Sequence, residues 1–180
     1  MEKTNRIILA DADLVSHFIT RGEVENIHLI FPDHPIYMLD KVHAELQNWR
    51  NVKVGLILSD LLKRKTIRLM DFPEENEEIK REYFWIKKML FKGDGESACM
   101  AVTRYNKDIL GSSNLKDIKS YCTMHKIDYL TTMDFLCAAL ATGLFNEARC
   151  DTFLKKVVNA GSKLPVKSMK EYTCRKIEFL

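Results

Sequence analysis

The sequence lacks the features that mark several large classes of protein. No apolar run approaches the roughly 20 residues that cross a bilayer, and the first residues lack the apolar core of a signal peptide. With 7 glycines and 4 prolines among 180 residues, the chain has no low-complexity or linker-like stretch. We therefore expect a cytoplasmic protein that does not contact a membrane. Its 46% hydrophobic content is sufficient for the core of one domain.

The cysteines and histidines show no metal-binding or disulfide spacing. The five cysteines are widely separated and contain no C-x-x-C, and the five histidines form no H-E-x-x-H motif. These patterns favour buried, inert thiols over a disulfide framework or a zinc site. The net charge of +3 is too small to indicate a polyanionic partner by itself.

Short apolar runs alternate with helical patterns along the chain. Strands are expected near 6–10, 36–39, 67–72, 108–113 and 128–130, and helical periodicity fills most of the sequence between and after them. This alternation predicts an α/β fold, a three-layer α/β/α sandwich around a mostly parallel sheet of four or five strands. The domain is expected to span residues 1–165, with residues 166–180 forming a basic C-terminal tail.

Acidic and polar residues follow the ends of several predicted strands. Asp11 comes directly after the first strand, Glu45 lies in the helix after the second, and Glu96 opens the helix that leads into the fourth. Asn114 and Asp117 come directly after that fourth strand. Because ligands of parallel sheets bind beyond the carboxyl ends of the strands, we expect these groups to converge on one cleft.

Carboxylates held close together repel one another unless a cation neutralises them. Oxygen ligands without accompanying cysteines or closely spaced histidines suit Mg²⁺ or Mn²⁺ rather than zinc. Such ions activate water and polarise phosphorus in the hydrolysis of phosphate esters. The acidic residues therefore predict a metal-dependent hydrolase that acts on phosphodiester bonds.

Four segments in this order resemble the PIN-domain nucleases: "IILADADLV", "KVHAELQ", "GDGESACMAV" and "ILGSSNLKD". They are most similar to the branch whose third acid lies in a Gly-Glu-Ser/Ala helix start, and the likeness covers roughly residues 6 to 165. The resemblance implies a PIN-like α/β/α sandwich and Mg²⁺- or Mn²⁺-dependent endoribonuclease activity on RNA. It also implies frequent membership of a toxin–antitoxin pair.

The resemblance assigns a role to each of these positions. Asp11, Glu45 and Glu96 match the first, second and third catalytic, metal-binding acids. Asn114 falls where the family has its fourth acid, with Ser112 in the place of the nearby hydroxyl residue and Asp13 in a position that supports the first acid. An asparagine brings no charge, so a second metal should be held less firmly, unless Asp117 compensates as a further ligand.

Other interpretations remain open at this point. Asp11 and Asp13 also suit helix capping, Glu96 suits the positive end of a helix, and Asn114 suits an N-cap. One alternative is a PIN-like protein that binds RNA or a protein partner without cleaving RNA. A second is a phosphoacceptor receiver domain, with Asp71 as the phosphorylated residue. The apolar helices near 24–31 and 53–62 are candidate surfaces for a homodimer or an antitoxin.

Overall fold

The sheet is five-stranded and entirely parallel. The computed structural model describes residues 6–19, 22–48, 52–90 and 92–180. Its strands occur in the order β3-β2-β1-β4-β5, and every neighbouring pair is parallel. The predicted α/β class and parallel sheet are therefore confirmed. The strands are β1 (Ile8–Ala10), β2 (Ile36–Leu39), β3 (Arg68–Met70), β4 (Ile109–Gly111) and β5 (Tyr129–Leu130).

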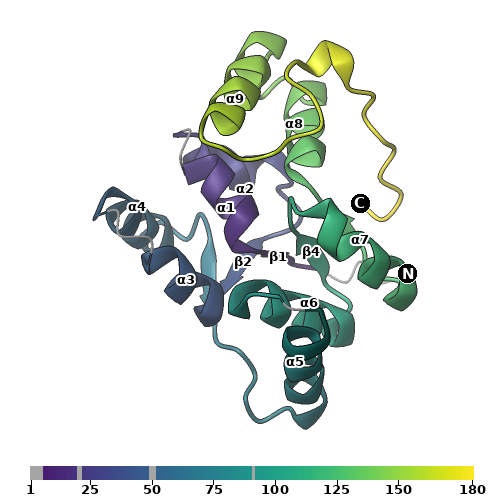
Figure 1. Cartoon of the computed structure of the whole chain (residues 1–180). Helices are drawn as coiled ribbons and strands as arrows, with labels where there is room; N and C mark the ends of the chain where they lie inside the picture. Colours follow the sequence, from purple (N-terminus) through teal and green to yellow (C-terminus); the bar gives the residue numbers. More distant parts are fainter. Residues whose placement is uncertain (1–5, 20–21, 49–51, 91) are drawn as a thin grey trace.

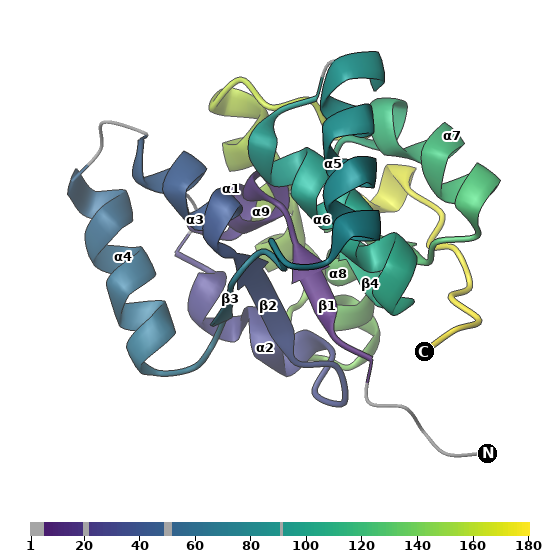
Figure 2. The ribbon, with the colours of Figure 1, turned by 90° about the horizontal axis from the view of Figure 1, so that it is seen from below.

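Helices cover both faces of this sheet and complete a three-layer sandwich. In Figure 1, α5 and α6 lie below the sheet, whereas α1, α2, α8 and α9 lie above it. Figure 2, turned by 90°, shows α5 and α6 in front of the strands. The helices are α1 (Ala12–Ile19), α2 (Ile27–Ile30), α3 (Asp40–Gln47), α4 (Val52–Lys63), α5 (Glu77–Leu90), α6 (Asp94–Asn106), α7 (Leu115–His125), α8 (Thr132–Ala141) and α9 (Glu147–Asn159), with short 3₁₀ turns at Val24–Asn26 and Met169–Glu171.

From β1 the chain continues to β2 and β3 on one side of the sheet, and it then crosses to β4 and β5 on the other side of β1. β1 pairs with β2 on one side and with β4 on the other, and Ala10 lies opposite Gly111. The ladder continues one step further, because the backbone N–H of Asp11 donates to the carbonyl of Gly111 at 2.8 Å. The residues that follow these two strands therefore begin side by side, at the kind of switch point where α/β proteins bind ligands.

The core lies between the sheet and the helices on each face. All three residues of β1 are fully buried, as is the run Ala98–Val102 of α6. On the opposite face, Phe18 packs against Phe135 and Phe153, with ring centroids 5.6 and 5.0 Å apart. Because both faces are covered, β1, β2 and β4 consist of continuous apolar runs rather than alternating patterns, whereas the edge strand β3 is largely exposed.

Helix α6 begins two residues earlier than the sequence suggested. We expected Glu96 to open this helix, but the helix starts at Asp94 and Gly93 is its N-cap. Gly95 therefore lies inside the first turn. A Cβ on Gly95 would stand 2.5 Å from Glu45 Oε2 and 3.0 Å from Val42 Cγ2, so the glycine allows α6 to pack closely against α3.

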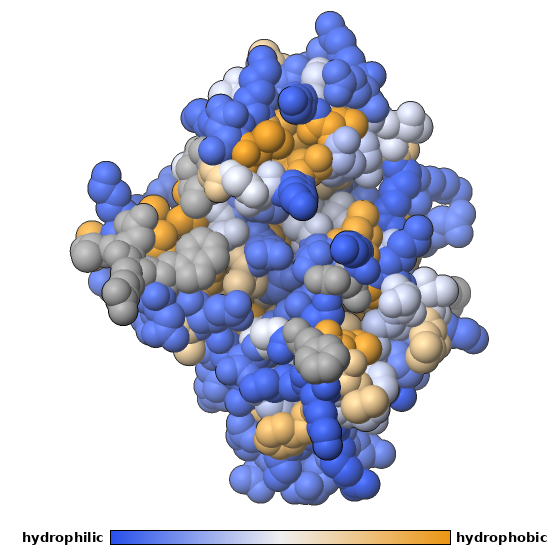
Figure 3. Space-filling model, in the orientation of Figure 1, coloured by the Kyte–Doolittle hydropathy of each residue, from blue (hydrophilic) through white to orange (hydrophobic). Residues whose placement is uncertain are grey.

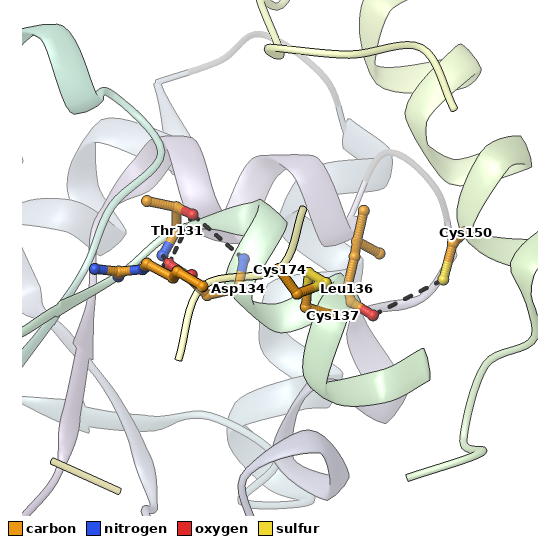
Figure 4. Close-up of a disulfide and its surroundings, with 7 residues drawn as sticks. Thr131, Asp134, Leu136, Cys137, Cys150 and Cys174 are labelled. Carbon is orange, nitrogen blue, oxygen red and sulfur yellow. Dashed lines mark hydrogen bonds and ion pairs between the residues drawn. A yellow bond between two sulfur atoms is a disulfide. The ribbon is translucent and has the colours of Figure 1, made fainter. Parts of the chain in front are cut away.

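The C-terminal segment folds back onto α8 and α9. Figure 4 shows the disulfide between Cys137 of α8 and Cys174, which corrects the expectation that all cysteines are free thiols. Arg175 reinforces the contact with two hydrogen bonds to Asp134, at 2.7 and 2.8 Å. The sequence could not predict this bond, because the 37-residue separation has no recognisable spacing and the approach depends on tertiary folding. The domain boundary near residue 165 stays a prediction.

The face of the molecule seen in Figure 3 is mostly hydrophilic, and its hydrophobic side chains form separate small patches. Among the described residues, no helix has both the length and the apolar character that crossing a membrane requires.

Candidate functional site

Asp11 lies at the point where β1 passes into α1. Its side chain is 3% exposed, and its Oδ1 accepts the backbone N–H of Leu14 at 2.9 Å, which caps the helix. The hydroxyl of Ser112, the residue after β4, also hydrogen-bonds this carboxyl group. Asp11 thus caps α1, but capping alone does not require a carboxylate to be buried at the switch point.

The surroundings of Asp11 disfavour its charged form. The pKa of the Asp11 carboxyl group is raised from 3.8 to about 8, mainly by burial and to a lesser extent by the negative charges of Asp13 and Glu96. The two hydrogen bonds from Leu14 and Ser112 act in the opposite direction but do not offset the burial. A nearby cation would therefore be needed to keep this carboxylate ionised at neutral pH.

Glu45 extends from α3 toward the first turn of α6. Its Oε2 accepts the backbone N–H of Gly95 at 3.3 Å, and the side chain is half-buried. Glu45 is therefore not an ordinary exposed helix residue. The amide of a helix N-terminus suits a carboxylate because the N–H groups there have no partner within the helix.

Glu96 lies in the first turn of α6, and a lysine accompanies it. Lys92 Nζ is 3.8 Å from Glu96 Oε1, and the two side chains are only 9% and 19% exposed. Sequence reasoning missed Lys92. The available signal was that Lys92 lies four residues before Glu96, because side chains at positions i and i+4 of a helix interact. Here, however, Lys92 precedes the first residue of α6.

The charges of the three acids act on one buried thiol. Burial raises the pKa of Cys99 well above its usual value, and the charges of Asp11, Glu45 and Glu96 raise it further. Cys99 lies in α6, and its Sγ is 3.8 Å from the carbonyl oxygen of Ala10, the last residue of β1. All three carboxylates are therefore near enough to influence Cys99, whose thiol lies against the end of β1.

The remaining predicted site residues follow β4 in the chain, except Asp13, which lies in α1. Asn114 occupies the N-cap position of α7, but its side chain makes no capping hydrogen bond. Ser112 is fully buried beside Asp11, and Asp13 is exposed in the first turn of α1. Asp117 belongs to α7, but its side chain lies outside the part of the chain that the structure describes.

A cluster of hydroxyl groups adjoins this side of the site. Ser113 and Thr132 contact each other through their hydroxyls, and Ser113 Oγ also accepts the backbone N–H of Thr132 at 3.2 Å. The ring Nδ1 of His17 is 2.9 Å from Thr132 Oγ1. Sequence reasoning did not find His17 or Thr132, because α1 and the start of α8 meet only in the folded chain.

The donor set has the chemistry of a magnesium or manganese site. Carboxylate, amide and hydroxyl oxygens surround the cleft, and hard divalent cations prefer such ligands. Within the described residues, however, no three Asp, Glu, His or Cys side chains stand close enough together to form a ready-made metal-binding group. The acids therefore line a common region without forming a closed cage.

The strand order bears on the receiver-domain alternative. Asp71 follows β3, which is an edge strand separated from β1 by β2, and its side chain is exposed. A phosphoacceptor at that position lies two strands away from Asp11, so the two aspartates do not form one acidic pocket. Comparison of the chain with protein-family models, curated proteins and solved structures gave no match.

Proposed function

We propose that this protein is a metal-dependent endoribonuclease that hydrolyses RNA phosphodiester bonds, with Asp11, Glu45 and Glu96 as its acidic residues. The observation that carries the proposal is that the charges of these three carboxylates all act on the buried Cys99, which lies against the end of β1 at the switch point of the sheet. Burial and the charge of Glu96 both disfavour the ionised form of Asp11 there, and a helix cap alone would not require a buried acid. Such a cost is typical of a functional site.

Mg²⁺ or Mn²⁺ is the proposed cofactor. When bound, such an ion supplies Lewis-acid polarisation of the phosphate and activation of the attacking water. Mg²⁺ is usually bound through one or two carboxylates plus waters and substrate phosphates, so a closed protein cage is not required. The open arrangement of Asp11, Glu45 and Glu96 is compatible with this mode of binding.

The chain's own residues prepare the site for a phosphodiester. Ser112 and the N–H of Leu14 fix the orientation of the Asp11 carboxyl group, and the N–H of Gly95 fixes that of Glu45. Asn114 offers a neutral amide where the PIN family has its fourth acid. The ammonium group of Lys92 adds a positive charge beside Glu96 and is suited to contact a phosphate oxygen.

The direct test is cleavage of a fluorescent single-stranded RNA with Mn²⁺ or Mg²⁺, with EDTA as the control. We expect Glu96→Gln to reduce the rate at least 100-fold, because the amide keeps the shape of the side chain but removes its charge. Glu75→Gln changes an exposed acid before α5 and should leave the rate unchanged. Equal activity of wild type and Glu96→Gln would refute the proposal.

The ion pair of Lys92 and Glu96 favours a second candidate function. Lys92 compensates part of the acidic charge without any metal, and Asn114 removes one acid from the family pattern. Both features suit a PIN-like protein that binds RNA or a protein partner without hydrolysis. RNA binding in gel-shift assays, together with no cleavage at any Mn²⁺ concentration, would support this second function instead.

A protein partner remains part of the proposal. Leu29 of α2 is 48% exposed and Leu56 of α4 is 68% exposed, so the two apolar helices are not fully buried in the monomer. We propose these helices as the surface for an antitoxin or a second copy of the chain. Sedimentation of the wild type and of Leu56→Glu would test the homodimer.

A further inference from the structure

A pocket next to the acids has no role in the proposed chemistry. It has a volume of about 380 Å³ and is lined by Lys41, Ala44, Glu45 and Asn48 of α3 and its C-terminal end, by Tyr83 of α5, and by Asp94 of α6. Its volume lies within the range of about 300–1,000 Å³ that is usual for small-ligand sites. Because Glu45 forms part of its wall, a group bound in the pocket lies beside the acidic cleft.

Asp94 gives this pocket a hydrogen-bond acceptor. The hydroxyl of Tyr83 donates to Asp94 Oδ1 at 2.8 Å, and Lys87 contacts the same oxygen. Asp94 Oδ2 accepts no hydrogen bond from the residues that the structure describes, and the side chain is 57% exposed.

Asn48 and Lys41 supply hydrogen-bond donors. Asn48 is exposed at the C-cap of α3, and its amide offers both an N–H₂ donor and a carbonyl acceptor. Lys41 pairs with Glu74 at 2.9 Å, and its Nζ lies 4.6 Å from the centre of the Phe72 ring and 5.1 Å from that of Tyr83. These contacts hold the lysine in place on the pocket wall.

We propose that this pocket binds a guanine base of the RNA, next to the phosphodiester that the acids cleave. The inference rests on the proposed function, because it identifies the substrate class of the same site. The Watson–Crick edge of guanine carries two adjacent N–H donors and one carbonyl acceptor. The two lone pairs of Asp94 Oδ2 accept the two donors, while Asn48 or Lys41 donates to the carbonyl oxygen.

The other bases fit this set of groups less well. Uracil has a single N–H between two carbonyl oxygens, which would face the negative charge of Asp94. Adenine and cytosine each place a ring nitrogen acceptor where guanine has its N–H donor. An acceptor opposite a carboxylate leaves two like groups facing each other in a partly desolvated pocket, which is costly.

The inference is tested by binding measurements without any divalent metal. The full-length protein in EDTA is titrated with GMP, AMP, CMP and UMP by isothermal calorimetry. We expect GMP to bind at least 10-fold more tightly than each of the other three. Asp94→Asn should remove this preference and leave the affinity for AMP unchanged within about twofold, since only guanine uses the carboxylate.

Two further variants keep the test informative if Asp94→Asn is poorly folded. Asn48→Ala should weaken GMP binding severalfold, whereas Asp71→Asn changes an exposed aspartate outside the pocket and should have no effect. Equal binding of all four nucleotides, or a preference that survives both Asp94→Asn and Asn48→Ala, would overturn the inference. A preference for another base that Asp94→Asn abolishes would overturn the assignment to guanine.

Different results would contradict the proposed guanine pocket and the proposed nuclease function. Selective GMP binding without Mn²⁺-dependent cleavage would support the pocket and contradict the hydrolase. Conversely, cleavage of RNA with no preference for guanosine next to the cut site, unaffected by Asp94→Asn, would support the hydrolase and contradict the pocket. Cleavage beside guanosine that Asp94→Asn shifts to other positions supports both.

Discussion

Replacing the buried acid of the site should make the metal-free protein more stable. In Asp11→Asn, the side chain keeps its shape and an oxygen that can accept the N–H of Leu14, and asparagine is itself a good N-cap. The change removes a carboxyl group that is 3% exposed and lies near the charges of Asp13 and Glu96. We therefore expect the variant to gain stability where the wild-type carboxyl group would ionise.

The magnitude follows from the pKa of Asp11. The pKa is about 8 in the folded protein and 3.8 as the reference value for the unfolded chain. The folded state therefore binds more protons between these two values, and its stability falls as the pH rises through that window. At about 1.4 kcal/mol per pKa unit, Asp11 lowers stability by up to about 4 kcal/mol at pH 7 relative to acidic pH.

Thermal unfolding in EDTA measures this effect. We expect Asp11→Asn to raise the Tm at pH 8 by at least about 5 °C, because 1 kcal/mol corresponds to about 2–4 °C in a domain of this size. The difference should shrink toward pH 4. Mn²⁺ should stabilise the wild type and leave Asp11→Asn unchanged, because the variant lacks the charge that the ion neutralises.

The control is Asp13→Asn, which changes an exposed acid in the same helix turn and should shift the Tm by less than about 2 °C. An Asp11→Asn variant that is less stable than the wild type at every pH would refute the reasoning. It would mean that the hydrogen bonds of the carboxylate stabilise the folded state by more than the burial of the carboxylate destabilises it.

Three further predictions concern packing, the C-terminal segment and the thiols. Gly95→Ala should lower the free energy of unfolding by about 1–3 kcal/mol and weaken Mn²⁺ binding in calorimetry, because the added Cβ would displace the Glu45 side chain. In the control Gly93→Ala, the added Cβ meets no atom closer than 3.7 Å, so stability and Mn²⁺ binding should both stay unchanged. Arg175→Ala should lower the free energy of unfolding in urea by about 3 kcal/mol, because the buried carboxylate of Asp134 loses its ion-pair partner. Lys176→Ala, on the exposed surface, should lower it by less than about 0.5 kcal/mol. The three free cysteines are buried with raised pKa values, so a thiol reagent at pH 8 should label none in the native protein, three after denaturation, and five after denaturation and reduction.

The sequence determined the elements and the acids that follow them. Apolar runs such as Ile8–Ala10 could only be buried strands, and their alternation with helical patterns allowed few folds other than a parallel sheet covered on both faces. Asp11, Glu45 and Glu96 could be selected because each occupies a predictable place beside a strand end or a helix start. These features are local, since they depend on residues only a few positions apart.

Only the tertiary structure decided which of these local features meet. The order β3-β2-β1-β4-β5 sets Asp11 beside Ser112 and leaves Asp71 at an edge, and no local pattern specifies that order. The Cys137–Cys174 bond and the pocket around Asp94 also join segments far apart in the chain. Such contacts depend on how helices pack across the sheet, which is settled by the shapes of many side chains together and not by any short stretch of sequence.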